Sequence, residues 1–161
     1  MNPIDAIGIT QVCARLIAAV LIGGGFGLNR ELHGKPAGLR THALVTLGAA
    51  LTTMLALPLH AEAGLDPNVL GRIIQGLLTG VGFLGAGVIL RDPAGHVTGL
   101  TTAATIWLCA GLGIVCGLGY WSLLFVAAAL VLAILMFGRA IELAAERVFR
   151  RRSETPPDHG V

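Results

Sequence analysis

The segment Gly80–Asp92, "GVGFLGAGVILRD", decides the fold because it combines bulky apolar side chains with four glycines. In water, glycine destabilises a helix interior by about 1 kcal/mol relative to alanine. In lipid, helices associate by close packing, and small residues allow their backbones to approach. The segment therefore predicts a membrane helix that packs against neighbouring helices.

The composition of the whole chain indicates the same solvent. The 161 residues are 55% hydrophobic and 12% charged, and the mean hydropathy is +0.80, whereas soluble domains are about 25% charged. Crossing the hydrocarbon takes about 20 apolar residues in a helix. We predict an all-α integral membrane bundle of five transmembrane helices in residues 1–143, followed by a basic, disordered tail, 144–161. The expected spans are residues 4–28, 42–59, 69–90, 100–117 and 120–143.

The basic residues predict the orientation. Arg30, Lys35 and Arg40 follow the first span, Arg91 follows the third, and Arg147 and Arg150 belong to the tail. The segments on the other side contain no lysine or arginine, so the positive-inside rule places the amino terminus outside and the carboxy terminus in the cytoplasm. The basic tail is expected to meet anionic lipid rather than nucleic acid.

Glycines four residues apart recur in three of the spans, as in "GGGFG", "GLLTG" and "GIVCG". Residues at this spacing share one helix face, and such elements favour tight helix–helix packing. We expect seven glycines to lie at these contacts: Gly23, Gly27, Gly76, Gly80, Gly87, Gly113 and Gly117.

A few polar residues interrupt the apolar spans and are candidates for function. Arg15 lies deep in the first span, where an arginine costs about 2.5–3.5 kcal/mol, so it needs a partner from another helix or a wet cavity; functional and structural roles are equally compatible. Gln75 and Thr79 share a face with Arg72, for which a salt bridge with Asp66 or Asp5 is the simpler alternative. Thr102, Thr105 and Cys109 align on the fourth span, and interhelical contact is their simpler role.

The loop after the first span holds a second group of candidates. Glu31 lies among basic residues, where a local ion-pair cluster would explain it, and Arg40 and Thr41 crowd the start of the second span. Thr41 is the expected N-cap of that helix. No catalytic constellation is present in the sequence, and the histidines and cysteines have no metal-ligand spacing. We therefore expect no enzymatic activity, no cofactor and no bound metal.

Three long blocks, containing "AGLRTH", "GFLGAG" and "GLTTAAT", resemble the signature of the MgtC/SapB family, which includes YhiD-type proteins. The resemblance runs from about residue 23 to residue 119. It implies a multi-pass protein of the bacterial inner membrane that is linked to magnesium limitation and, in pathogens, to virulence. It places the charged signature residues of the family on Glu31 and Arg40, and its third-helix signature on Arg72, Gln75 and Phe83. The chain is most similar to short members that lack the soluble carboxy-terminal domain.

Two functions remain open from the sequence. The first is a non-enzymatic regulator that contacts other membrane proteins, among which the resemblance implies the proton-translocating ATP synthase. The second is a small transporter or channel-forming homo-oligomer for Mg²⁺ or another cation, with Arg15, Gln75 and Thr79 along its path. A purely structural scaffold is a weaker third alternative.

Overall fold

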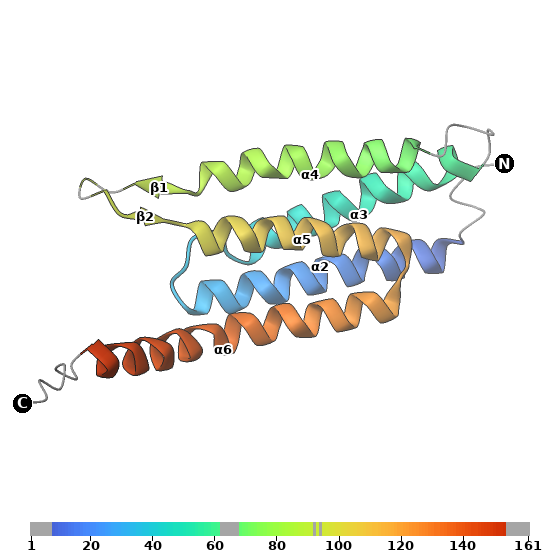
Figure 1. Ribbon diagram of the computed structural model, residues 1–161. Helices are drawn as coiled ribbons and strands as arrows, with labels where there is room; N and C mark the ends of the chain where they lie inside the picture. The colour runs from blue at the N-terminus through green and yellow to red at the C-terminus, as the bar shows by residue number, and fades with distance from the viewer. Residues whose placement is uncertain (1–7, 62–67, 92, 94, 154–161) are drawn as a thin grey trace, which may run out of the picture. The chain divides into compact units, whose positions relative to one another are not determined.

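The computed structural model describes residues 8–61, 68–91, 93 and 95–153, and it is helical apart from one short hairpin (Figure 1). The helices are α2 (Ile9–Leu32), α3 (Leu39–Ala61), α4 (Val69–Gly87), α5 (Leu100–Leu118) and α6 (Trp121–Ser153). Strands β1 (Leu90–Arg91) and β2 (Val97–Thr98) pair antiparallel. The all-α prediction is therefore confirmed at the level of fold class.

The chain divides into two compact units, Met1–Phe125 and Val126–Val161. In the first unit, α3 and α5 pack against each other, and each also contacts α2 and α4. Figure 1 shows the connection between α2 and α3 at the same end of this unit as the β1–β2 hairpin. The second unit holds the remainder of α6.

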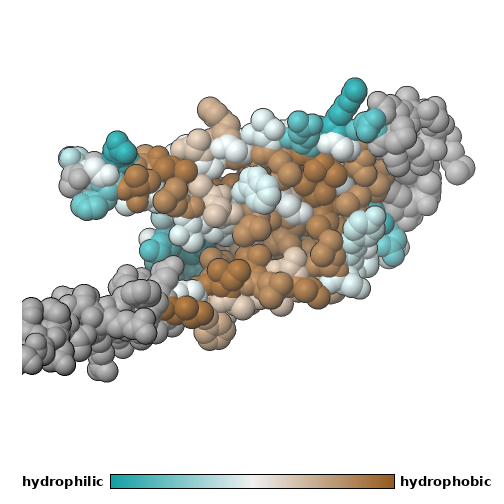
Figure 2. Space-filling model, viewed as in Figure 1, coloured by the Kyte–Doolittle hydropathy of each residue, from teal (hydrophilic) through white to brown (hydrophobic). Residues whose placement is uncertain are grey.

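In the part of the chain that the structure describes, four helices are long and apolar enough to cross a membrane: Ile9–Leu32, Leu70–Gly87, Leu100–Leu118 and Trp121–Gly138. Within the described residues α3 does not join this group; Arg40, Thr41 and His42 make its beginning polar. The sequence predicted five spans, and four of them correspond to helices that meet this criterion. Figure 2 shows the apolar surface over the middle of the helices.

Helix α2 begins and ends later than the expected span 4–28. Gly8 precedes it with a φ of +77°, a left-handed conformation that glycine adopts without strain. At the other end the helix continues through Asn29 and Arg30 to Leu32. Asn29 and Arg30 remain helical although they are polar. The Arg30 side chain is buried among the helices.

The boundaries of α3 and α4 also differ from expectation. Helix α3 begins at Leu39, so Thr41 lies inside its first turn and the prediction that Thr41 is the N-cap is wrong. Helix α4 ends at Gly87, and Leu90 pairs with Thr98 in the hairpin instead of continuing the helix. Strands of two residues carry no periodic signal, so the hairpin could not be recognised from hydropathy.

A tight connection joins α4 to α5. Gly99, immediately before α5, has a φ of +88°, and a side chain on it would lie 2.9 Å from the carbonyl carbon of Val88. One turn further along, Gly85 faces Ala103, which would be 3.5 Å from an added Cβ. The end of α4 and the beginning of α5 are therefore in direct contact.

Helix α6 extends to Ser153, beyond the expected boundary at Leu143. Residues 144–153 are helical rather than disordered, and this segment contains two alanines and four arginines, which favour helices. The remainder of the expected tail, 154–161, lies outside the described residues.

Candidate functional site

Arg30, at the end of α2, is buried with 4% of its surface exposed. Its Nη2 donates a hydrogen bond to Oγ1 of Thr102 at 2.5 Å, and its Nη1 donates to Oγ1 of Thr105 at 3.4 Å. Both threonines are buried on α5, so the guanidinium connects two helices that are far apart in the sequence. The sequence placed Arg30 in the loop after the first span, whereas the structure places it in the last turn of α2.

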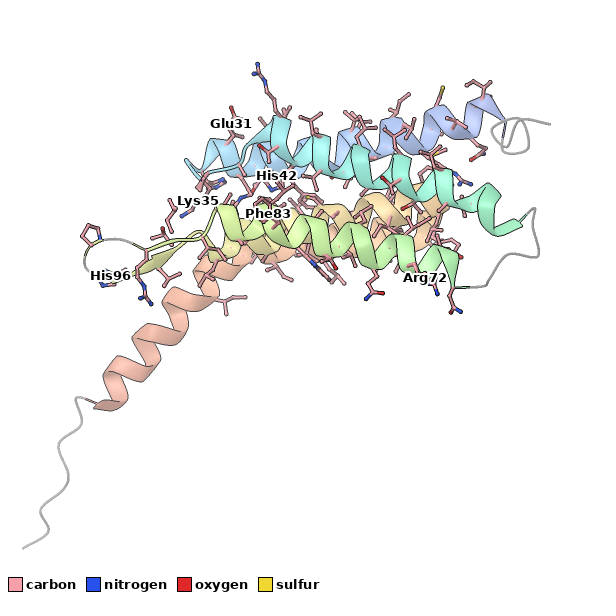
Figure 3. The ribbon with its side chains drawn as sticks, turned by 90° about the horizontal axis from the view of Figure 1, so that it is seen from above. Glu31, Lys35, His42, Arg72, Phe83 and His96 are labelled. Atoms are coloured by element: carbon pink, nitrogen blue, oxygen red, sulfur yellow. The ribbon has the colours of Figure 1, made fainter. Side chains whose placement is uncertain are left out.

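A layer of buried polar groups continues from Arg30 into α3. The His42 side chain is completely buried, with Nδ1 3.0 Å from the carbonyl oxygen of Gly38. Thr46 donates to the carbonyl of His42 at 2.8 Å and lies beside the buried thiol of Cys109. Nε of Arg30 and Nε2 of His42 have no hydrogen-bond partner in the described part of the chain. Figure 3 shows His42 directed between the helices.

Four of the seven expected packing glycines lie at close helix contacts. An added Cβ on Gly23 would lie 2.6 Å from the His42 carbonyl oxygen, and one on Gly27 would be 2.6 Å from that of Gly38. On α5, an added Cβ on Gly113 would be 2.7 Å from the Cβ of Ala49, and one on Gly117 would be 2.7 Å from the carbonyl oxygen of Ala50. Helix α3 is therefore held between α2 and α5 by glycine contacts on both sides.

Arg15 obtains its partner from another helix, as its depth in α2 required. Its Nη1 donates to the carbonyl oxygen of Gly117 at 2.7 Å, and the guanidinium packs against Gly119. Carbonyls at a helix C-terminus lack intrahelical donors and carry partial negative charge. Arg15 therefore compensates the end of α5, although its Nε has no hydrogen-bond partner among the described residues.

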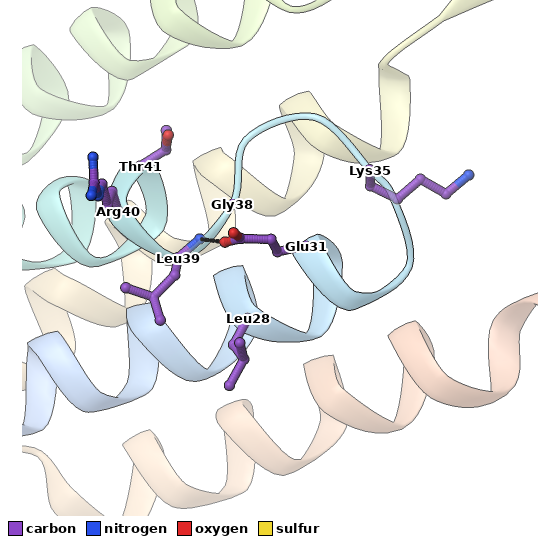
Figure 4. A pocket seen from close by; sticks show the side chains of 7 residues that line it. All are labelled: Leu28, Glu31, Lys35, Gly38, Leu39, Arg40 and Thr41. Carbon is purple, nitrogen blue, oxygen red and sulfur yellow. Dashed lines mark hydrogen bonds between the residues drawn. The ribbon is translucent and has the colours of Figure 1, made fainter.

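The charged loop between α2 and α3 does not form the expected ion-pair cluster. Glu31 accepts a hydrogen bond from the backbone N–H of Leu39 at 3.1 Å and so caps the first turn of α3. Arg40 and Thr41 are exposed, as is Lys35. Among the described residues, neither Lys35 nor Arg40 forms a side-chain hydrogen bond or ion pair. Figure 4 shows the hydrogen bond between Leu39 and Glu31, with Lys35 and Arg40 on either side of it.

The remaining three expected packing glycines do not contact another helix of the described chain. Gly76, Gly80 and Gly87 are exposed, and no described atom lies within 4 Å of where their Cβ would be. The opposite side of α4, with Ile74, Leu77, Leu78 and Val81, packs on the core. The spacing of the glycines identified one face of α4, and within the described chain this face points away from the other helices.

The other candidates on α4 lie on the same exposed face as these glycines. Gln75 and Thr79 are exposed, and Thr79 donates to the carbonyl of Gln75 at 2.8 Å. Phe83 is 82% exposed. Arg72 is also exposed and points away from the helices in Figure 3, whereas Asp5 and Asp66, its expected partners, lie outside the described residues. We call the set Gln75, Gly76, Thr79, Gly80, Phe83 and Gly87 the outer face of α4.

Two features of this bundle were missed from the sequence. The inward turn of Arg30 could have been suspected from its spacing, since it follows Gly23 and Gly27 at seven and three residues on one helix face. The sequence gave no indication that His42 is buried, apart from its alignment with Thr46 on one helix face. Across the described segments, no group of three His, Cys, Asp or Glu side chains could hold a metal ion.

The part of the chain that resembles known sequences covers most of the helices described above. Residues 16–144 match the sequence profile of the MgtC family. Protein SrpB of Synechococcus elongatus is 47% identical over 117 residues, which are 68% of this chain and 64% of SrpB. Protein MgtC of Salmonella typhimurium is 45% identical over 104 residues, 65% of this chain and 42% of MgtC.

A third relative, from Escherichia coli, is named "Putative magnesium transporter YhiD" and is 42% identical over 116 residues, 68% of this chain and 52% of YhiD. The chain thus spans between 42% and 64% of the length of these relatives. No solved structure matches the chain.

Proposed function

The chain belongs to the MgtC family, and from this premise we propose that it is a non-enzymatic membrane regulator, linked to magnesium limitation, that acts by contact with another membrane protein. Its family and its apolar helices make it a multi-pass protein of the bacterial inner membrane. The proposed orientation keeps the amino terminus outside and the carboxy terminus in the cytoplasm, with α3 as the fifth span.

The outer face of α4 is the observation that carries this proposal. A helix face that meets lipid is normally covered by bulky apolar side chains, as on α6, where Leu123 is 53% and Phe125 66% exposed. On α4, Ile74, Leu77, Leu78 and Val81 pack inward. Apart from the exposed Phe83 and Leu84, the outward side carries mainly glycine, glutamine and threonine. Figure 2, with α4 along the upper edge, shows pale and teal surface there beside the apolar body. Such a face favours protein over lipid as its neighbour.

The chemistry of this face specifies its partner. The Gln75 amide forms no side-chain hydrogen bond with the described residues, and an unpaired amide is costly in hydrocarbon. Gly76 and Gly80 leave open space beside it, so the backbone of a partner helix can approach closely. We therefore propose a transmembrane helix of another protein that carries small residues and one hydrogen-bonding side chain at the level of Gln75.

The buried polar groups support a regulator more than a transport path. Arg30 donates hydrogen bonds to the hydroxyls of Thr102 and Thr105, and Arg15 donates to the main chain of α5. Side chains engaged in this way join helices and need not bind a passing ion.

A small cation transporter is the second candidate, supported by the name of YhiD and by the exposure of Gln75 and Thr79. Several copies arranged with α4 inward would surround a polar path. Purified protein in liposomes would then carry Mg²⁺ above the rate of empty liposomes, and Thr79→Val would change the flux. Tight liposomes with no flux for Mg²⁺, protons or K⁺ would remove this candidate.

Site-specific photocrosslinking tests the regulator. The photoreactive residue p-benzoylphenylalanine replaces Thr79 on the outer face of α4 in cells grown in low magnesium, and adducts are identified by mass spectrometry. The same residue in place of Phe125 is the control, because Phe125 is exposed on an apolar surface. We expect one different membrane protein to be captured from position 79 and absent from position 125. Adducts only with a second copy of the chain, or the same adducts from both positions, would contradict the proposal.

A further inference from the structure

A pocket at the end of the first unit lies where α2 gives way to α3. It has a volume of about 590 Å³ and is lined by Leu28, Glu31, Lys35, Leu39, Arg40 and Thr41, together with Gly38. Figure 4 shows Glu31 between Lys35 and Arg40. The lining is both charged and apolar, since Leu28 is 46% and Leu39 40% exposed.

The charges of this pocket are incompletely compensated. Lys35 and Arg40 form no ion pair with any described residue, and one carboxylate oxygen of Glu31, Oε2, is occupied by the N–H of Leu39. Two cations and one carboxylate leave a net charge of +1. The first backbone N–H groups of α3, at Arg40 and Thr41, add the positive end of a long helix. The pocket therefore favours a ligand that contains a negatively charged group.

The apolar lining narrows the class of ligand. Leu28 belongs to a helix long and apolar enough to cross the membrane and lies near the end of that helix. At such a depth, charged headgroups and the first methylenes of acyl chains occur together. A phospholipid presents both in one molecule, whereas free phosphate uses only the charged part.

We propose that this pocket binds the headgroup of a phospholipid that carries an ammonium group, with its phosphodiester at Arg40 and the first turn of α3. The ammonium group lies at the free oxygen of Glu31, and the acyl chains follow Leu28 and Leu39. Lys35, on the other side of Glu31, adds positive charge to the pocket. The phosphodiester supplies the negative charge, and the ammonium explains why a carboxylate lines a site for phosphate.

Native mass spectrometry of the delipidated full chain tests this inference. Phosphatidylethanolamine, phosphatidylglycerol, phosphatidylcholine and inorganic phosphate are added separately. We expect one tightly bound phosphatidylethanolamine and weaker phosphatidylcholine, whose quaternary ammonium cannot donate to Glu31. Arg40→Gln is expected to weaken phosphatidylethanolamine binding by about tenfold, the effect of losing one charge-assisted contact. Arg91→Gln, an exposed cation on the β1–β2 hairpin, is the matched control and should leave binding unchanged.

Glu31→Gln separates the two halves of the headgroup. The glutamine oxygen can still accept the N–H of Leu39, so the start of α3 is retained, but the negative charge is lost. We expect the preference for phosphatidylethanolamine over phosphatidylcholine to disappear while phosphatidylglycerol binds at least as well as before. Equal losses for Arg40→Gln and Arg91→Gln, displacement of lipid by inorganic phosphate, or an unchanged preference in Glu31→Gln would each overturn the inference.

Discussion

Nη2 of Arg30 lies 2.5 Å from Oγ1 of Thr102, so a cation from the end of α2 is seated on the first turns of α5. The two residues are 72 positions apart in the sequence. A charge buried in a bundle needs hydrogen bonds of this kind, because transfer from water is otherwise costly. Removing this contact therefore tests how much the buried guanidinium contributes to the stability of the bundle.

Thr102→Val is expected to lower the free energy of unfolding by about 1–3 kcal/mol, because it leaves a buried guanidinium without its nearest acceptor. Valine has nearly the shape of threonine, so packing is retained. Thr101→Val, on the exposed side of the same turn, should change stability by less than about 0.5 kcal/mol. Thermal unfolding in micelles, followed by the fluorescence of Trp107 and Trp121, measures both. Equal stability of the two variants would contradict the assignment.

Gly113→Ala is expected to destabilise the bundle by about 1–3 kcal/mol, because the new methyl group would overlap the carbonyl oxygen of Thr46 and the Cβ of Ala49. Gly111→Ala on the same helix has nothing within 4 Å of the added Cβ among the described residues. It should be neutral or slightly stabilising, since alanine is the better helix former. Unfolding midpoints in the same micelles compare the pair. A loss of stability in Gly111→Ala as large as in Gly113→Ala would argue against this packing of α3 and α5.

Gly80→Leu should leave the fold intact and prevent the partner helix from docking on the outer face of α4. The added side chain projects from the outer face of α4 into open space, so the unfolding midpoint should remain within the error of the wild type. Capture of another membrane protein by the photoreactive residue at position 79 should disappear, since close approach of a helix is blocked.

Gly48→Leu on α3 is the matched control for this experiment. Gly48 is also exposed with open space around it, but it lies outside the outer face of α4. Its leucine variant should retain partner capture. If both variants retain capture, the partner does not dock at Gly80.

Arg15→Gln distinguishes the two roles that the sequence left open for this residue. If Arg15 serves to compensate the carbonyl of Gly117, the free energy of unfolding should fall by about 1–2 kcal/mol. Gln11→Ala, on an exposed position one turn earlier in α2, should have little effect. We expect the structural result. Unchanged stability in Arg15→Gln, combined with lost partner capture, would indicate a functional role instead.

The helices could be predicted from sequence largely because the apolar blocks are long and glycine-marked. Leu100 was identified as the beginning of α5, and a Cβ added at Gly23, Gly27, Gly113 or Gly117 would meet α3 or the residue that precedes it. Arg30 could not be placed, because hydropathy assigns every arginine to water and only tertiary packing supplies the two threonine oxygens. The neighbour of the α4 glycines could not be predicted for a related reason: small residues mark a face where backbones can approach, without specifying whether the neighbour is the same chain.

The functional assignment depended on different information. The charged loop residues were recognised as candidates, but the capping contact of Glu31 requires the fold of the loop, with Gly34 in a left-handed conformation. Periodicity describes residues three or four apart and is silent on contacts made across a turn. The pocket between Lys35 and Arg40 could therefore be found only from coordinates.

The contact of Gly99 with Val88 has a mechanical consequence. Because the backbones of Gly99 and Val88 lie so close together, we expect a tilt of α4 to displace the first turn of α5 as well. A partner helix that docks at Phe83 and displaces α4 would thereby also shift the first turns of α5, where the Arg30 guanidinium is bound. The close contact at Gly99 would transmit that displacement.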